Sequence, residues 1–449
     1  EPCCFVAYTI KGYGTPLAGH KDNHAGLMNE AQMADFKQSM KIADGQEWEA
    51  FAGLDIDAAT LRDFIGDTAY ADAPSRRHHA PTVDVPDLPV PKGEKASTQQ
   101  AFGQILNDLG RGDSALAAHM VTTSPDVTVS TNLGGWVNQR GLFNRHERAD
   151  VFRQENVASV QRWARTQSGQ HFELGIAENN LFLMLSALGL SEPLFGARLL
   201  PVGTLYDPFV NRGLDALFYA CYQDSRFMVV GTPSGVTLAP EGGAHQSVNT
   251  PLVGMSMPGL SYFEPAYADE LAAIMTWGFH HMQAQDGGSV YLRLSTRNIT
   301  QPDRSLSAPD KERITSGAYW LTPPAPGAEL AIVYAGAVAP EAISAHQQVL
   351  EDIPGAGLLA VTSPDRLHAD WLSAKRRRRQ GDRHALGRVE ALLAELAPDA
   401  VLITVIDGHP TALSWLGAVG SQKVTALGVD QFGQSADLDD VYRAVGIDE

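Results

Sequence analysis

Short apolar segments alternate with helical segments along most of the 449-residue chain, and this alternation constrains the fold more than any other feature. Between residues 97 and 305 the strand candidates are 117–121, 199–204, 227–231 and 289–294. A second series follows at 330–335, 357–361, 401–406 and 424–428. Alternating strands and helices predict mostly parallel sheets with helices on both faces. The sequence therefore predicts an α/β protein with a larger and a smaller domain.

Proline-rich segments separate these domains. We expect linkers at 72–96 and 306–328, which divide the chain into an initial segment 1–71, a larger domain 97–305 and a smaller domain 329–449. The larger domain is predicted to open with a helix, because Ser97 and Gln100 match a capping box ahead of apolar residues at helical spacing. The initial segment starts with a predicted strand, Phe5–Ile10.

The segment Phe172–Asn180 places an acidic residue, Glu178, ahead of a strongly apolar run, Leu181–Leu190. The run is too apolar for a surface helix and too short to span a bilayer, so it predicts a helix packed into a core. Burial would raise the pKa of Glu178 and let the carboxyl group hold a proton near neutral pH. A structural glutamate paired with an arginine would give the same sequence. Both interpretations stay open at this point.

Other candidate residues follow predicted strands, where open α/β sheets place their ligands. Tyr206 and Phe209 lie in a loop after one strand, beside an Asp-Pro pair that favours a loop over a core position. His245 lies in the glycine-rich turn Glu241–Ser247, which leaves an imidazole free to approach a ligand. Asp126 comes just past another strand. These side chains are candidates for one site at the carboxyl edge of a sheet.

A glycine-rich loop near the start of the chain carries His20 and His24 together with Lys21. Such a cluster would suit an anionic ligand, although a solvated surface loop is the simpler interpretation. The formal net charge of −18 argues against a general nucleic-acid-binding protein. The 3 cysteines form neither a disulfide framework nor a zinc spacing, so we expect a reducing, cytoplasmic setting. No apolar run is long enough to cross a membrane.

Taken together, Gly175–Asn179, the aromatic loop and Gly242–Gln246 resemble the pyrimidine-binding domain of the transketolase superfamily of thiamine-diphosphate enzymes. Ala7–Gly14 and Gly428–Ser435 narrow the resemblance to the homodimeric type of pyruvate dehydrogenase decarboxylating component. The resemblance implies two Rossmann-like thiamine-fold domains, the pyrimidine-binding domain at 97–305 and a transketolase-type C-terminal domain at 329–449. The initial segment 1–71 would then be the end of a diphosphate-binding domain.

The resemblance implies a thiamine-diphosphate site with named contacts. Glu178 would hydrogen-bond a ring nitrogen of the cofactor's aminopyrimidine and share a proton with it. Tyr206 or Phe209 would stack on the pyrimidine ring, with Tyr206 as the first choice. Asp126 would lie near the same ring. These residues are the expected cofactor-binding set.

The implied reaction is the oxidative decarboxylation of a 2-oxo acid, pyruvate first, with acyl transfer to a lipoyl-bearing acyltransferase. Glu178, His245, His24 and His20 are the expected catalytic residues, the histidines binding the substrate carboxylate and moving protons. Two-carbon transfer between sugar phosphates is the main alternative, but no Arg or Lys lies between His245 and Arg293 to hold the phosphate. An inactive regulatory subunit of the same fold is a further alternative.

One motif of the resembled family is missing. The family binds the diphosphate and its Mg²⁺ through a Gly-Asp-Gly motif followed by an Asn, and this sequence has no such pattern. A diphosphate needs a divalent cation held by oxygen ligands, so we expect no metal ligand within this chain. The missing domain is expected either on a separate chain or on an amino-terminal part removed by cleavage. A homodimer, or a pairing with the chain that carries that domain, is the expected assembly.

Overall fold

The computed structural model describes residues 4–68, 77–149 and 154–448, which divide into two compact units, 1–76 and 77–449. In the described part of the first unit, α1 (Glu30–Ser39) and α2 (Ala58–Gly66) are joined by turns, and no side chain is buried. Asn29 caps α1 by accepting from the Gln32 amide, and the Gln32 side chain bonds back to the Asn29 amide. The strand predicted at Phe5–Ile10 is wrong, because a strand needs a neighbour and none pairs with these residues in the described chain.

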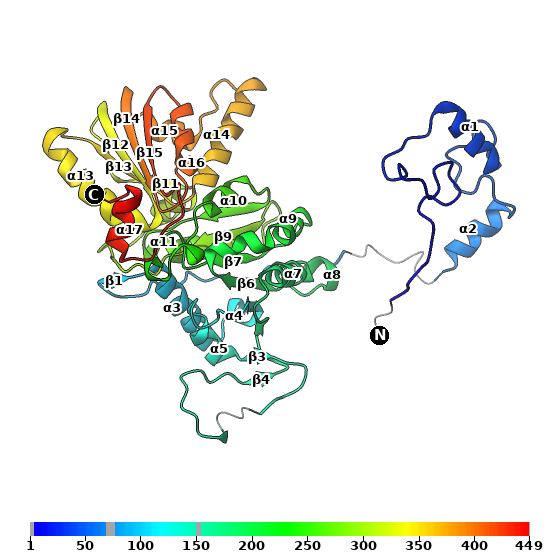
Figure 1. Ribbon diagram of the computed structural model, residues 1–449, viewed down its shortest axis with the longest axis horizontal. Helices are drawn as coiled ribbons and strands as arrows, with labels where there is room; N and C mark the ends of the chain where they lie inside the picture. The colour runs from blue at the N-terminus through cyan, green and yellow to red at the C-terminus, as the bar shows by residue number, and fades with distance from the viewer. Residues whose placement is uncertain (1–3, 69–76, 150–153, 449) are drawn as a thin grey trace. The chain divides into compact units, whose positions relative to one another are not determined.

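The second unit contains, within the described residues, an 8-stranded sheet in which every pair is parallel (Figure 1). Its order is β4 (Arg165–Thr166), β3 (Leu142–Phe143), β5 (His171–Glu173), β2 (Met120–Ser124), β6 (Leu200–Leu205), β7 (Met228–Gly231), β9 (Ser289–Arg293) and β8 (Leu260–Phe263). The central strands are buried along their whole length, as expected for a parallel sheet between helices.

Helices connect these strands, namely α3 (Thr98–Arg111), α4 (Ala115–His119), α5 (Gly134–Arg140), α7 (Glu178–Gly189), α8 (Ser191–Phe195), α9 (Leu214–Tyr222), α10 (Thr250–Ser256) and α11 (Ala268–His281). The Ser97 hydroxyl caps α3 by accepting from the Gln100 amide at 3.1 Å. The strand predicted at 117–121 begins later, at Met120, because Ser114 caps α4 first. Local capping therefore displaced the predicted boundary.

A second sheet of five strands in the described residues forms the carboxyl-terminal part. Its order is β11 (Ala318–Thr322), β13 (Gly357–Val361), β12 (Ala328–Ala335), β14 (Leu396–Ile406) and β15 (Lys423–Leu427). All pairs are parallel except β11 with β13. The accompanying helices are α13 (Ala339–Asp352), α14 (Pro364–Arg379), α15 (Arg388–Leu393), α16 (Thr411–Ser414) and α17 (Leu438–Val445). The prediction of an α/β fold with mostly parallel sheets is confirmed.

Described residues of both proline-rich segments contribute to the folded core or to a sheet. Residues 306–328 contain α12 (Ala308–Thr315) and the edge strand β11. In the first segment, Val83, Val85 and Leu88 are buried against the core of the second unit. The short ladder of β1 (Lys95–Ala96) with β10 (Ile299–Thr300) then leads into α3.

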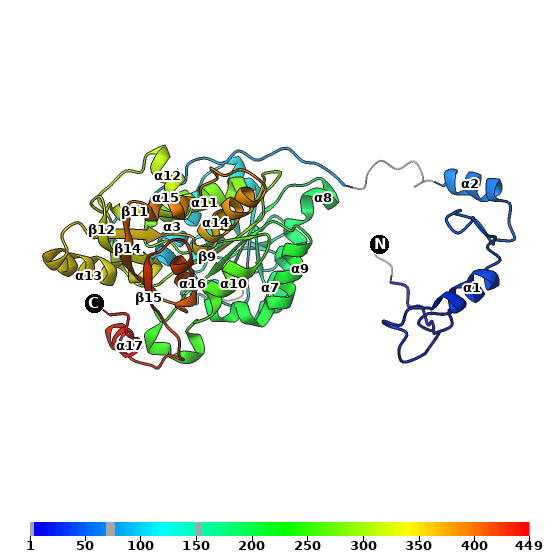
Figure 2. The same ribbon diagram turned by 90° about the horizontal axis from the view of Figure 1, so that it is seen from above.

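Helix α7 is buried on one face. Leu181, Phe182 and Leu185 are fully buried there, and each such side chain contributes about 1.5–3 kcal/mol. Leu183 on the other face is half exposed, so the predicted core helix is covered on one side within this chain. Helices α7 and α9 lie side by side in both views (Figures 1 and 2). Across the described ranges, no helix is long and apolar enough to cross a membrane.

Candidate functional site

Glu178 is the first residue of α7, just past the carboxyl end of β5. Its side chain is 10% exposed, and its Oε1 accepts a hydrogen bond from Arg212 Nη1 at 2.7 Å. Arg212 follows β6 in the short 3-10 helix η1 (Asp207–Gly213) and is 52% exposed. The first turn of a helix favours a carboxylate through the helix dipole. The structural interpretation of Glu178, a buried glutamate with an arginine partner, therefore has its partner in Arg212.

Three rings gather beside this ion pair. The Arg212 guanidinium carbon lies 3.6 Å from the centre of the Phe209 ring. Phe209 and Tyr206 are stacked, with ring centres 5.9 Å apart and planes 19° from parallel. The His245 ring meets both edge-on, at 5.7 Å from Phe209 and 5.9 Å from Tyr206. The structure therefore brings Glu178, Phe209, Tyr206 and His245 into one cluster, called here the edge cluster, in which Arg212 joins Glu178 to Phe209.

His245 ends the short helix η3 (Gly243–His245). Its Nδ1 is buried and has no hydrogen-bond partner within the described residues, and the Glu241 carboxylate lies 3.8 Å away. The Gln246 side chain donates to the Gln434 carbonyl at 3.2 Å. The carboxyl-terminal segment Gly428–Ser435 thus packs against the turn that carries His245. These are two of the stretches on which the sequence resemblance was based.

A fully buried ionic group fixes the two loops of the edge cluster. Asp207, next to Tyr206, accepts from Arg293 Nε at 3.0 Å, from Thr250 Oγ1 at 2.6 Å, and from the hydroxyls of Ser247 and Tyr291. Ser247 lies two residues after His245, so the group ties the aromatic loop to the histidine turn. We call Asp207, Arg293 and the residues bonded to them the buried network.

Arg293, the last residue of β9, also binds Glu264 through Nη1 at 2.7 Å and the Asp407 carbonyl through Nη2 at 3.0 Å. Burial lowers the pKa of Arg293, but Glu264 and Asp207 outweigh it and hold that pKa well above its usual value. Burial raises the pKa of Glu264, against the opposite effect of Arg293. The network therefore combines one permanent cation with carboxyl groups that have no access to water.

Asp407 brings the second sheet into this network. It follows β14, and its carboxylate accepts from the Val236 amide at 2.9 Å and the Tyr442 hydroxyl at 3.3 Å. Burial raises the pKa of Asp407 to about 7, although the Val236 amide and Arg293 act in the opposite direction. A Cβ added at Gly235 would lie 2.3 Å from this carboxylate, so the loop after β7 needs glycine there. The carboxyl ends of β6, β7, β9 and β14 therefore meet around one buried group.

The other predicted site residues lie outside the edge cluster's described contacts. Asp126 sits in the turn after β2 with φ 67°, and its amide donates to Glu173 Oε1 at 2.9 Å. His24 Nδ1 lies 2.8 Å from Lys11 Nζ, and His20 Nδ1 accepts from the Asp22 amide at 3.1 Å. Both histidines belong to the amino-terminal unit and are exposed, so their catalytic roles stay predictions.

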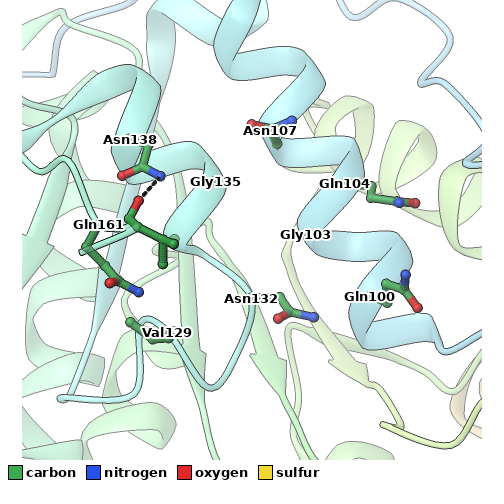
Figure 3. Close-up of a pocket in the computed structure, with 11 residues that line it drawn as sticks. Gln100, Gly103, Gln104, Asn107, Val129, Asn132, Gly135, Asn138 and Gln161 are labelled. Carbon is green, nitrogen blue, oxygen red and sulfur yellow. Dashed lines mark hydrogen bonds between the residues drawn. The ribbon is translucent and has the colours of Figure 1, made fainter. Parts of the chain in front are cut away.

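A separate hollow of about 430 Å³ lies between α3 and α5 (Figure 3). It is lined by side-chain amides and glycines, none of them charged: Gln100, Gly103, Gln104, Asn107, Asn132, Gly134, Gly135, Asn138 and Gln161, with Val129 and Val160. The Asn138 side chain donates to the Val160 carbonyl at 3.2 Å and accepts from the Arg162 amide at 2.7 Å. None of the predicted site residues lines this hollow. Among the described residues, no group of His, Cys, Asp and Glu is arranged to hold a metal ion.

Comparison with solved structures shows which fold class the protein belongs to. A transketolase from Campylobacter jejuni superimposes with a TM-score of 0.66 at 16% identity, over 97% of this chain and 60% of that one. A transketolase from Leishmania mexicana gives 0.59 at 17% identity, over 93% and 50%. A chain described as a split gene transketolase, inactive β4 tetramer, gives 0.51 at 18% identity, over 79% and 94%. The protein has a transketolase-like α/β fold with a cluster of aromatic, acidic and imidazole groups at the carboxyl edge of its larger sheet.

Sequence matches narrow that class. Residues 87–302 match the family model of the pyruvate dehydrogenase E1 component middle domain. Pyruvate dehydrogenase E1 components from Pseudomonas aeruginosa and Mycolicibacterium smegmatis are 26% and 25% identical, over 84% and 97% of this chain but 44% and 49% of their own lengths. The chain therefore resembles the carboxyl-terminal part of a pyruvate dehydrogenase E1 component and spans about half the length of these relatives.

Arg212 and the buried network did not emerge from sequence reasoning. Asp207 was noted only as part of an Asp-Pro pair, and Arg293 only as the end of a stretch without basic residues. The signal for Arg212 was its place as the first cation after the aromatic loop. Nothing local to Asp407 pointed to its role, because its partners lie in other strands and loops.

Proposed function

We propose that this chain forms the pyrimidine-binding part of a thiamine-diphosphate-dependent enzyme that decarboxylates a 2-oxo acid, pyruvate first, and passes the acyl group to a lipoyl-bearing acyltransferase. The observation that carries the proposal is the edge cluster, in which a buried carboxyl group, two stacked aromatic rings and an imidazole meet at the carboxyl edge of a parallel sheet. The similarity to pyruvate dehydrogenase E1 components supports this choice of reaction.

The residues present fit the aminopyrimidine half of that cofactor. Phe209 and Tyr206 offer a flat aromatic surface. The Phe209 ring lies next to Arg212, which is bonded to Glu178. This favours Phe209 over Tyr206 as the stacking residue. Glu178 offers a carboxyl group at the start of a helix, and the buried Nδ1 of His245 still lacks a partner within the described residues. A polar group of a bound ligand would satisfy this nitrogen.

Bound thiamine diphosphate supplies an electron sink for decarboxylation. Within this chain, Glu178 would hold a proton for a ring nitrogen, and Phe209 with Tyr206 would orient the ring and exclude water from one face. His245 would bind the substrate carboxylate and move a proton through its ring nitrogens. Asp126, His24 and His20 keep the roles predicted for them from the sequence.

The diphosphate and its Mg²⁺ would be held by residues outside this chain. A further surface supports an additional chain or domain at the site: α7 is a neighbour of both α8 and α9 (Figure 1), and each of these helices exposes apolar side chains. The exposed side chains are Leu183, Leu194, Phe195, Phe218, Tyr219 and Tyr222. An exposed patch of this kind is typical of an interface, and α7 is the helix that begins with Glu178. We propose a homodimer, or a pairing with the chain that carries the diphosphate site.

Turnover by the intact protein, with any subunit that copurifies, tests the reaction. We expect reduction of a dye or of a lipoyl acceptor with pyruvate, and none of the two-carbon transfer from xylulose phosphate to ribose phosphate. Activity with the sugar phosphates alone would move the protein to the transketolase reaction. Activity with neither substrate, in a preparation that contains the diphosphate site, would favour the inactive regulatory subunit.

The role of Glu178 is tested by Glu178→Gln. We expect a loss of about 10²–10⁴-fold in pyruvate turnover, because the amide cannot carry the proton. Glu192→Gln is the matched control, since Glu192 also pairs with an arginine, Arg198 at 3.4 Å, but lies on α8 outside the edge cluster. A Glu178→Gln enzyme as active as the Glu192→Gln control would refute the proposed role.

A further inference from the structure

Arg212 makes two contacts that define its place in the edge cluster. Its Nη1 donates to Glu178 Oε1 at 2.7 Å, and its guanidinium carbon lies over the Phe209 ring, 3.6 Å from the ring centre. A guanidinium is planar, carries hydrogen-bond donors at its rim and stacks on aromatic faces. One side chain thus occupies both the acceptor oxygen of Glu178 and a face of Phe209.

A bound aminopyrimidine would require the same two groups. It is also a planar, nitrogen-bearing ring, and the proposed function assigns its hydrogen bond to Glu178 and its stacking to Phe209. Both planar groups cannot lie against one face of Phe209 and meet the same carboxyl oxygen. Arg212 is half exposed and sits in the short 3-10 helix η1, so its side chain has solvent into which it can turn.

Resting on the proposed function, we infer that Arg212 is a placeholder in the pyrimidine subsite, which the cofactor ring must displace from Glu178 and Phe209. Arg212 thereby lowers the affinity for the cofactor and keeps the Glu178 carboxyl group paired until the ring arrives. The contacts broken are a half-exposed ion pair and a cation–π contact. Contacts of these kinds together correspond to about a tenfold change in affinity.

The test is calorimetric titration of the intact protein, with any subunit that copurifies, by thiamine diphosphate in the presence of Mg²⁺. We expect Arg212→Ala to bind about tenfold more tightly than the wild type. The sign is diagnostic, because the cofactor is an anion and loss of a positive charge by itself predicts weaker binding. Arg212→Met, which keeps the apolar part of the side chain, replaces the alanine variant if that variant does not fold.

Arg443→Ala is the matched control, because Arg443 also pairs with a carboxylate, Asp440 at 3.0 Å, but lies on α17 outside the edge cluster. Its affinity should equal that of the wild type. Equal or weaker binding by both Arg212 variants, with binding by the wild type, would overturn the placeholder and leave the proposed function standing. No binding by any of these proteins, in a preparation that contains the diphosphate site, would overturn the proposed function and the placeholder together.

Discussion

Two arginine–carboxylate pairs lie at the same edge of the larger sheet, and they differ in nearly every physical respect. Arg293 and Asp207 are both 0% exposed, and Arg293 also binds Glu264 and the Asp407 carbonyl. Arg212, in contrast, is 52% exposed and binds one oxygen of Glu178. If the buried pair separates, water cannot solvate its charges, whereas water can solvate Arg212 when it leaves Glu178.

The two pairs therefore have different roles: the buried pair holds the loops in place, and the exposed pair lies where a ligand is proposed to bind. The buried network fixes the spacing between the aromatic loop and the His245 turn. Its hydrogen bonds must therefore stay formed whether or not a ligand is bound. The exposed pair joins groups that are proposed to meet a ligand, so it must be replaceable. A carboxyl group at the start of a helix and next to a movable arginine is suited to such an exchange.

Arg293→Met should give the largest effect and tests whether the buried network stabilises the fold. This change leaves the buried carboxyl groups of Asp207 and Glu264 without their cation, and we expect the free energy of unfolding to fall by about 3–5 kcal/mol. Urea denaturation of the purified variant measures it. Arg443→Met is the control, because its pair with Asp440 is mostly exposed, and it should change stability by less than about 1 kcal/mol. Similar losses in the two variants would contradict the framework role.

The next largest effect is the contribution of Asp407 to the free energy of unfolding, and this contribution depends on pH. Its pKa is raised by burial to about 7 in the folded protein, above the ordinary value of 3.8, so the folded state binds its proton more tightly than the unfolded state. The stabilisation is complete below about pH 4 and is lost as the pH rises through about 7, with a slope of at most about 1.4 kcal/mol per pH unit. Asp407→Asn mimics the protonated group and should remove this dependence.

The measurement is the difference in unfolding free energy between wild type and Asp407→Asn at a series of pH values from 4 to 8. Asparagine keeps an oxygen for the Val236 amide. Because its side chain stays neutral, the free energy of unfolding of the variant should rise relative to that of the wild type as the pH rises. Asp437→Asn, at the exposed start of α17, controls for the loss of one negative charge. A constant difference across this range would show that Asp407 does not titrate within it.

The smallest effect is expected at the exposed pair. Arg212→Ala should lower the free energy of unfolding by less than about 1 kcal/mol, because solvent and salt screen a half-exposed ion pair. Thermal unfolding at low and high salt measures the loss, which should shrink as salt is added. A loss as large as that of Arg293→Met would place Arg212 in the framework and weaken its role as a placeholder.

Much of the fold could be read from the sequence, because strands, caps and apolar faces are local patterns. The strands at 199–204, 227–231 and 289–294 were found within a residue of β6, β7 and β9. Two errors arose where pairing with a neighbouring strand decides the structure. Phe5–Ile10 has strand-like residues but no strand beside it, and residues 306–328 have a linker composition but contribute β11 to a sheet.

The same division holds for the site. The sequence alone predicted that Tyr206, Phe209 and His245 follow strands and that Glu178 heads a buried helix, and parallel strands deliver the residues that follow them to one edge of a sheet. Only the tertiary structure decided that Arg212 lies between Glu178 and Phe209, and that Arg293 and Asp407 join the loops beneath them. Long side chains choose partners across strands and loops far apart in the chain, and that choice depends on packing and exclusion of water rather than on local pattern.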